Sequence, residues 1–223
     1  MDVPLPTMLA IDTSCGQCSV ALSVGGDVSV LLVDDQPSKQ AELLFVLIEE
    51  ALMQQNMTYH DIDKLVVIVG PGSFTGVRIA IAAIQGISLV TNLPVIPVSS
   101  CHAIAWQYHK QTNEPGPYAV INDAKRGQVS VQLMDDRLLP SSQVELYDVS
   151  HFEEKRLSLK GYRFIGSGVV CVANDCDDAS VNICADAAGA IYAALSLIQT
   201  NNIAVDNQLL TPLYTRPPDA IKK

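Results

Sequence analysis

Residues 65–78 read LVVIVGPGSFTGVR, and this stretch decides the fold. Its first five residues form a continuous apolar run of strand length, which is typical of a strand buried on both faces. The following Gly-Pro-Gly ends the strand. From Ser73 or Thr75 the apolar pattern predicts a helix that runs to about Val90. The stretch is therefore a strand-to-helix unit of an α/β protein.

The residues before this unit predict three strands and a helix. Thr7–Ser14 is a short apolar run, while Gln17–Gly25 and Val28–Val33 alternate apolar and polar residues around a glycine turn. Two such runs joined by a tight turn indicate a hairpin, so we expect three antiparallel neighbours. A helix from Ser38 to Asn56 follows, with Ser38 as its expected N-cap.

The residues after this unit repeat the pattern in a shorter form. Val95–Val98 predicts a strand, and Ser99 or Ser100 is expected to cap the next helix. The pattern further predicts strands at Tyr118–Asn122, Val129–Met134 and Tyr162–Ile165, a helix at Ala185–Ile198 and an extended tail at Thr211–Tyr214. We therefore expect a mixed α/β fold with two lobes, of which the second is truncated.

Composition excludes several classes of protein. The chain has 223 residues, 48% of them hydrophobic, and a formal net charge of -10. The apolar content excludes a disordered chain, and the acidic charge disfavours direct binding to nucleic acid. We expect no membrane span, because the run Val77–Val90 is short and interrupted by polar residues. Since no signal peptide is apparent at the N-terminus, we expect a cytoplasmic protein.

Six cysteines raise the question of a metal or redox site. Cys15 and Cys18 have the C-x2-C spacing, but no second pair of ligands follows, and a structural zinc site needs four. We therefore expect reduced, structural thiols and no metal.

Two loops are candidates for phosphate binding. The first contains Asp12, Thr13 and Ser14 between the first two strands; alternatively, it is a polar turn bonded to its own backbone. The second begins a helix, where glycines and free N–H groups favour an anion, or else it packs closely against a neighbour. Its candidate residues are Gly70, Gly72, Ser73, Thr75, Gly76 and Arg78. It is not a Walker A loop, because no Gly-Lys-Ser/Thr follows.

No nucleophile and base are recognisable as a catalytic pair. The four histidines are scattered along the chain, and adjacent acids such as Glu49 and Glu50 do not share a helix face. We therefore expect no catalytic residue.

Several segments together resemble the TsaB (also called YeaZ) family. They are Ile11-Asp12-Thr13-Ser14, the run from Gly70 to Ile79 and Pro97-Val98-Ser99-Ser100, with weaker matches at Asn122–Val129, Gly166-Ser167-Gly168 and Pro212–Arg216. The run from Gly70 to Arg78 is the most specific of these. The chain departs from the family pattern near Lys39-Gln40, at Gln128 and at Thr215.

The resemblance implies an actin-like/sugar-kinase (ASKHA, ribonuclease H-like) fold. We expect a first lobe of residues 1–100 plus about 200–223, and a smaller second lobe of about 101–199. It also implies a non-catalytic subunit of the bacterial complex that makes N6-threonylcarbamoyladenosine at position 37 of tRNA (t6A37). Such a subunit pairs with a catalytic TsaD-like subunit and is joined by a TsaE-like ATPase. It meets tRNA only through the complex, and forms a homodimer when its partner is absent.

Departures from the catalytic paralogue support the non-catalytic interpretation. The paralogue carries two metal-binding histidines four residues apart on one helix, and the resemblance places Ser100 and Ile104 at these positions. Isoleucine cannot bind a cation, and His102 lies on a different face. We therefore expect ATP, ADP and metal on the partner subunits and none bound by this chain alone. The alternatives are an active ATPase or small-molecule kinase of the same fold and, less well supported, a peptidase.

The resemblance also places the partner contact on the two front helices. Both carry more apolar residues than one sheet face can cover. The residues expected at the interface are Leu43, Val46, Phe74, Ile79, Ala80, Ala83, Ile84 and Ile87.

Overall fold

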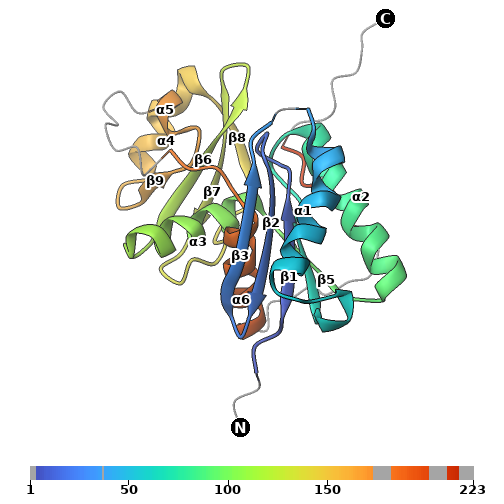
Figure 1. Cartoon of the computed structure of the whole chain (residues 1–223). Helices are drawn as coiled ribbons and strands as arrows, with labels where there is room; N and C mark the ends of the chain where they lie inside the picture. Colours follow the sequence, from blue (N-terminus) through green and yellow to red (C-terminus); the bar gives the residue numbers. More distant parts are fainter. Residues whose placement is uncertain (1–3, 37, 173–181, 201–209, 216–223) are drawn as a thin grey trace, which may run out of the picture.

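The fold contains two sheets with helices between and beside them (Figure 1). The computed structural model describes residues 4–36, 38–172, 182–200 and 210–215. The first sheet has the strand order β3-β2-β1-β4-β5, and the second has the order β8-β7-β6-β9. The predicted α/β fold with an actin-like, ribonuclease H-like sheet is confirmed by this strand order.

The first sheet is built as the sequence predicts. Strands β1, β2 and β3 are antiparallel neighbours, and β4 and β5 continue parallel to β1. All five residues of β1 are buried, because it is the central strand and both of its faces are covered. The strands are β1 (Met8–Asp12), β2 (Cys18–Val24), β3 (Asp27–Asp34), β4 (Lys64–Ile68) and β5 (Val95–Val98).

Helices α1 (Gln40–Gln54) and α2 (Phe74–Thr91) cover the face of the first sheet that points away from the second sheet. Ser73 caps α2 through a hydrogen bond from the Gly76 N–H, as expected. The prediction that Ser38 caps α1 was wrong. Ser38 has a φ of 72°, and Lys39 occupies the N-cap position without a side-chain hydrogen bond.

By length and composition alone, α2 is apolar enough to cross a membrane, with a mean hydropathy of 1.5 over 18 residues. No membrane span was predicted from the sequence, because the run Val77–Val90 is interrupted by polar residues. In the fold, the inner side of α2 belongs to the core beneath the first sheet, with Val77, Ala80 and Ile84 buried. A core helix meets the same length and composition test as a membrane span.

Helix α6 (Ala187–Gln199) lies against the other face of the first sheet, and α3 (Ser100–Thr112) packs between α6 and the second sheet. They share one apolar core with that face and with the second sheet. Ser99 caps α3 as predicted. The division into two lobes stays a prediction, and α6 packs on the first sheet although it lies within the range assigned to the second lobe.

The second sheet is smaller and less regular. It contains β6 (Tyr118–Lys125), β7 (Gln128–Met134), β8 (Glu145–Asp148) and β9 (Arg163–Ile165), with the short helices α4 (Phe152–Ser158) and α5 (Val169–Val172) beside it. Strand β8 and helix α4 were missed by the sequence analysis. Both are short and largely exposed, so neither carries a strong apolar period.

Candidate functional site

The loop after β1 places a carboxyl group in the interior. Asp12 is fully buried, and its Oδ1 accepts a hydrogen bond from the Ser14 N–H at 2.8 Å. Its Oδ2 has no hydrogen-bond partner within the described part of the chain. Burial raises the pKa of Asp12 to about 7. The hydrogen bond from the Ser14 N–H agrees with the alternative interpretation of this loop as a polar turn bonded to its own backbone. That turn does not explain why Oδ2 has no partner among the described residues.

The two candidate phosphate loops touch each other. The Thr13 hydroxyl donates to the Gly76 carbonyl at 2.6 Å, and the Ser73 N–H donates to the Ser14 carbonyl at 2.7 Å. A Cβ on Gly72 would lie 2.6 Å from the Ser14 carbonyl oxygen. Glycine is therefore required here for close packing of one loop on the other, as the alternative interpretation of this loop expects.

Arg78, a candidate phosphate ligand, is engaged by aromatic rings. Its guanidinium carbon lies 3.8 Å from the centroid of Phe74, and its Nε donates to the Tyr214 hydroxyl at 2.7 Å. The rings of Phe74 and Tyr214 stack with centroids 5.3 Å apart. The Leu213 N–H also donates to the Val69 carbonyl, so the tail is anchored beside the second loop. The last residue of the tail motif, Arg216, lies outside the described residues.

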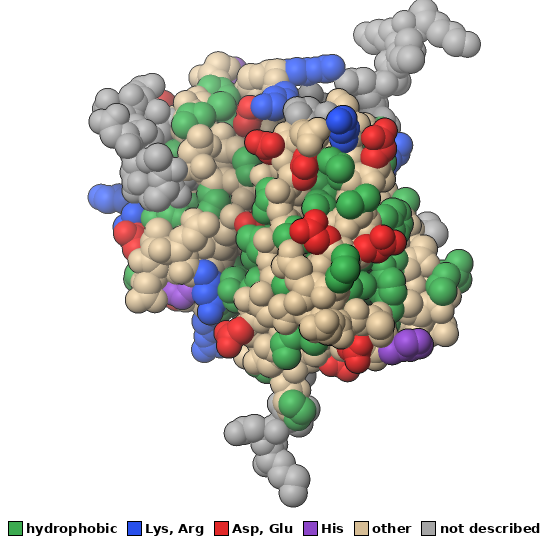
Figure 2. All heavy atoms as spheres, viewed as in Figure 1, with side chains coloured by type: hydrophobic (Ala, Val, Ile, Leu, Met, Phe, Trp, Pro, Cys, Tyr) green, Lys and Arg blue, Asp and Glu red, His purple; other side chains and the backbone are tan. Residues whose placement is uncertain are grey.

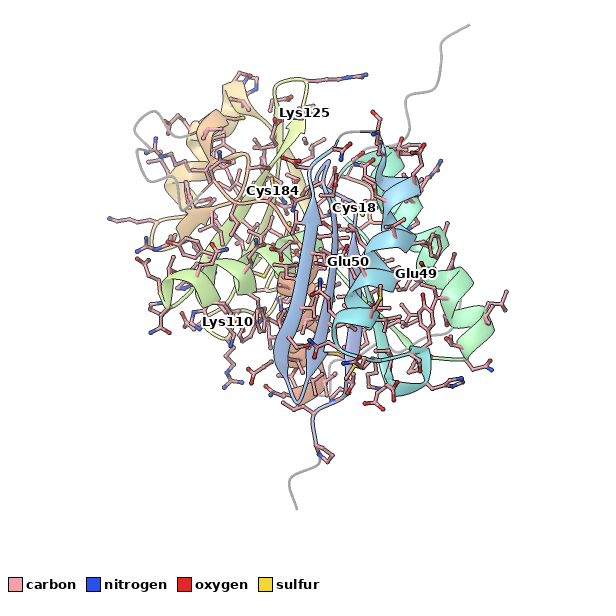
Figure 3. The ribbon with its side chains drawn as sticks, viewed as in Figure 1. Cys18, Glu49, Glu50, Lys110, Lys125 and Cys184 are labelled. Carbon is pink, nitrogen blue, oxygen red and sulfur yellow. The ribbon has the colours of Figure 1, made fainter. Side chains whose placement is uncertain are left out.

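A cavity of about 800 Å³ opens beside these loops. Its walls come from the β1–β2 loop, the β4–α2 loop, the tail, strands β6 and β7 of the second sheet, and the segments around Ser167 and Cys184. Figure 3 shows Lys125 near the tip of the β6–β7 hairpin and Cys184 below it, between the two sheets. The lining residues are Ser14, Cys15, Gly16, Pro71, Gly72, Ser73, Phe74, Asn122, Asp123, Ala124, Lys125, Ser130, Ser167, Cys184, Leu213, Tyr214 and Thr215. The two loops of this cavity were predicted as candidate sites, whereas its lining residues from β6, β7 and the segments around Ser167 and Cys184 were not.

The helix positions compared with the catalytic paralogue are buried. The Ser100 hydroxyl donates to the Pro71 carbonyl at 2.6 Å, and Ile104 lies in the core. His102 is 1% exposed, with its Nε2 3.3 Å from the Ser196 hydroxyl. Burial lowers its pKa to about 4, so the imidazole is neutral and structural. No group of three His, Cys, Asp or Glu side chains suited to a metal occurs in residues 4–36, 38–172, 182–200 and 210–215.

The predicted interface residues divide between the core and the surface. Ala80, Ala83, Ile84 and Ile87 are buried against the first sheet, which corrects their assignment to a partner surface. Leu43 and Ile79 are half-buried, whereas Val46 and Phe74 are exposed. The error arose because α2 is apolar all round, so its period could not show which side faces the sheet.

Exposed apolar side chains cover the outside of the two helices, and Val46 is the one of them that was predicted at the interface. We define the helix-pair surface as Phe45, Val46, Met53, Leu89 and Val90, which are between 48% and 83% exposed. Figure 2 shows hydrophobic side chains gathered over α1 and α2, with acidic side chains among them.

The buried carboxyl group of Asp12 makes a testable contribution to stability. A folded-state pKa above the unfolded value means that the folded state holds the proton more tightly. The contribution of Asp12 to the free energy of unfolding therefore falls as the pH rises from about 4 to about 7, by up to about 4 kcal/mol in total, and is constant above that range.

Asp12→Asn keeps the acceptor for the Ser14 N–H and removes the titratable group. The stability of the variant relative to the wild type should be greater at about pH 8 than at about pH 5 in urea unfolding. An equal difference at both pH values would contradict this account.

Two comparisons with known proteins each match about half of this chain. The family model described as "TsaD: tRNA N6-adenosine threonylcarbamoyltransferase" matches residues 38–139. The tRNA threonylcarbamoyladenosine biosynthesis protein TsaB of Haemophilus influenzae is 36% identical over 48% of this chain and 46% of its own length. The aligned part of this chain thus covers about half the length of this relative.

Two further comparisons cover more of the chain. The protein of the same name from Buchnera aphidicola subsp. Baizongia pistaciae is 32% identical over 74% of this chain and 76% of its own length. The solved structure titled "YeaZ from Pseudomonas aeruginosa" has a TM-score of 0.77 at 23% identity, covering 93% of this chain and 99% of its own, which shows the shared fold. The match to the Buchnera protein is long and similar enough to show that this chain belongs to the TsaB (YeaZ) family.

Proposed function

We propose that this chain is a non-catalytic subunit of the machinery that makes N6-threonylcarbamoyladenosine in tRNA. In this proposal the helix-pair surface docks a TsaD-like catalytic subunit, and a TsaE-like ATPase joins the pair. The observation that carries the proposal is the exposed apolar surface of α1 and α2, which the chain's own sheet leaves uncovered. Clustered, exposed apolar side chains mark surfaces that bind other proteins.

The shape of α2 supports a close helix-to-helix contact. Ala82 and Gly86 are exposed and lie four residues apart, on the same side as Leu89 and Val90. A Cβ on Gly86 would meet no atom within 4 Å, so the space above it is open. Small side chains flanked by large apolar ones allow the backbone of a partner helix to approach closely.

The charge on the two helices indicates the character of the partner. Together α1 and α2 carry three glutamates and one arginine, and Arg78 is already engaged with Phe74 and Tyr214. Glu42, Glu49 and Glu50 are exposed around the helix-pair surface. A partner with an apolar centre and a basic rim would be electrostatically complementary.

A homologous partner fits this surface for a geometric reason. The TsaD family model matches residues 38–139, a range that contains both docking helices. A protein that shares these helices can present them in the same way, so the contact would be approximately two-fold symmetric. The same geometry would let two copies of this chain pair when the partner is absent.

The non-catalytic role rests on three buried residues, Asp12, Ser100 and Ile104. Asp12 is one buried carboxyl group, and the positions that hold histidines in the paralogue are the buried Ser100 and Ile104. We propose that ATP, ADP and metal are bound by the partner subunits. An active ATPase or kinase remains the second candidate because the cavity of about 800 Å³ could hold a nucleotide. Titration calorimetry with ATP and Mg²⁺ on the isolated chain separates the two: micromolar binding with turnover would favour the enzyme.

Contact with tRNA would occur through the complex. A net charge of -10 gives this chain a surface that repels the phosphate backbone, so a basic partner must supply the affinity. Because tRNA is the proposed substrate of the complex, we propose that the chain acts in the cytoplasm.

The decisive experiment is reconstitution of tRNA modification from purified components. We expect the TsaD-like subunit to co-purify with this chain, and threonylcarbamoyladenosine formation to be lost when this chain is left out. Equal product formation with and without this chain would refute the proposed function.

A further inference from the structure

Two cysteines that are far apart in the sequence meet in the cavity. Cys15 lies in the β1–β2 loop and is half-buried, whereas Cys184 precedes α6 and is exposed. Both thiols line the cavity, and each is close enough to shift the pKa of the other. The C-x2-C spacing suggested Cys18 as the partner of Cys15, but Cys18 is buried in the core beneath the first sheet.

The backbone around the two thiols holds them together. The Gln17 side-chain amide donates to the Ala185 carbonyl at 3.2 Å. The Ala187 N–H donates to the Ser19 hydroxyl at 3.0 Å. The β1–β2 loop and the segment entering α6 therefore run side by side, and these bonds limit how far the sulfur atoms can separate.

The surroundings assign different roles to the two thiols. The neighbouring Cys15 thiol and the charge of Lys125 lower the pKa of the Cys184 thiol. The neighbouring Cys184 thiol, burial and the proximity of Asp12 raise the pKa of the Cys15 thiol. The exposed Cys184 is thus the better nucleophile at neutral pH, and Cys15 is positioned to react second.

We propose that Cys15 and Cys184 are a redox-active pair that closes to a disulfide in the presence of a peroxide. The Cys184 thiolate attacks one oxygen of hydrogen peroxide, the O–O bond breaks, and hydroxide leaves to give a sulfenic acid. The Cys15 sulfur then attacks the Cys184 sulfur, and the S–O bond breaks. The leaving hydroxide takes the Cys15 proton as water. In total two thiols are oxidised to one disulfide, and one peroxide is reduced to two waters.

The bond would cross-link two segments of the cavity wall. It would link the β1–β2 loop, which contacts the start of α2 through Ser14 and Ser73, to the segment that leads into α6. A reductant such as dithiothreitol would reopen it by thiol exchange. Oxidation would therefore restrict the movement of the β1–β2 loop relative to the segment that leads into α6.

The test uses the full chain, hydrogen peroxide and peptide mapping by mass spectrometry without reduction. We expect a Cys15–Cys184 linked peptide, a fall of two free thiols per chain, and recovery of both with dithiothreitol. Cys184→Ser should abolish the linked peptide. Cys171→Ser is the matched control, because Cys171 is also exposed, and it should leave the linked peptide unchanged.

Two results would overturn the proposal. One is a wild-type chain that keeps both thiols after peroxide treatment while remaining folded by circular dichroism. The other is a linked peptide that joins Cys184 to any cysteine other than Cys15. Since Cys184 is exposed, its replacement should not disturb folding, and so the variant remains informative.

Discussion

Replacing Leu89 with glutamate should disrupt binding to a TsaD-like subunit while leaving the fold intact. Leu89 is 81% exposed on α2, so a charged side chain is readily hydrated in the free chain. In the complex the carboxylate would be buried without a basic partner, at a cost of about 3 kcal/mol or more. The dissociation constant should rise by roughly 100-fold or more. Titration calorimetry or surface plasmon resonance with the purified partner measures this change.

A matched control comes from the second lobe. Leu157 is 79% exposed on α4, so Leu157→Glu makes the same chemical change at nearly the same exposure. It should leave the dissociation constant within about twofold, because a substitution far from the interface affects association little. If both variants bind equally well, the helix-pair surface is not the docking site.

Replacing Gly76 with alanine should be strongly destabilising. A Cβ at this position would overlap the Thr13 carbonyl oxygen, a backbone atom that cannot rotate away. The two loops would have to separate, which would also break the bond from the Thr13 hydroxyl to the Gly76 carbonyl. We expect a loss of about 3 kcal/mol, or a fall in melting temperature of roughly 6–12 °C for a chain of this size.

The same substitution elsewhere on the same helix should have the opposite effect. Gly86 is also in α2, but a Cβ there would meet no atom within 4 Å. Gly86→Ala should therefore stabilise the isolated chain by about 1 kcal/mol through helix propensity. Thermal unfolding of both variants measures the contrast. Equal melting temperatures would show that the two loops do not pack as closely as described.

The first lobe could be predicted in detail because its signals are local. The buried run at Leu65 begins a strand, Ser73 and Ser99 cap the helices that follow, and the glycine turn at Gly25-Gly26 closes a hairpin. Each signal depends on neighbouring residues alone. The expected strands and helices of this lobe therefore agree with the structure to within a few residues.

The faces of the helices and the contacts between loops could not be predicted in this way. Helix α2 is apolar on every side, so its sequence does not distinguish the buried Ile84 from the exposed Leu89. The contact of Arg78 with Tyr214 and the proximity of Cys15 and Cys184 join segments that are far apart in the sequence. Such pairs depend on the tertiary packing, which the local sequence pattern does not show.

Photocrosslinking from the edge of the helix-pair surface tests the central claim most directly. Met53 is 71% exposed at the end of α1, and a benzophenone amino acid there replaces one large apolar side chain by another. With the TsaD-like subunit present, we expect crosslinks from position 53 to that subunit and none from the same group at position 157. Crosslinks from position 157 alone, or none from position 53 in a complex that still forms, would contradict the account.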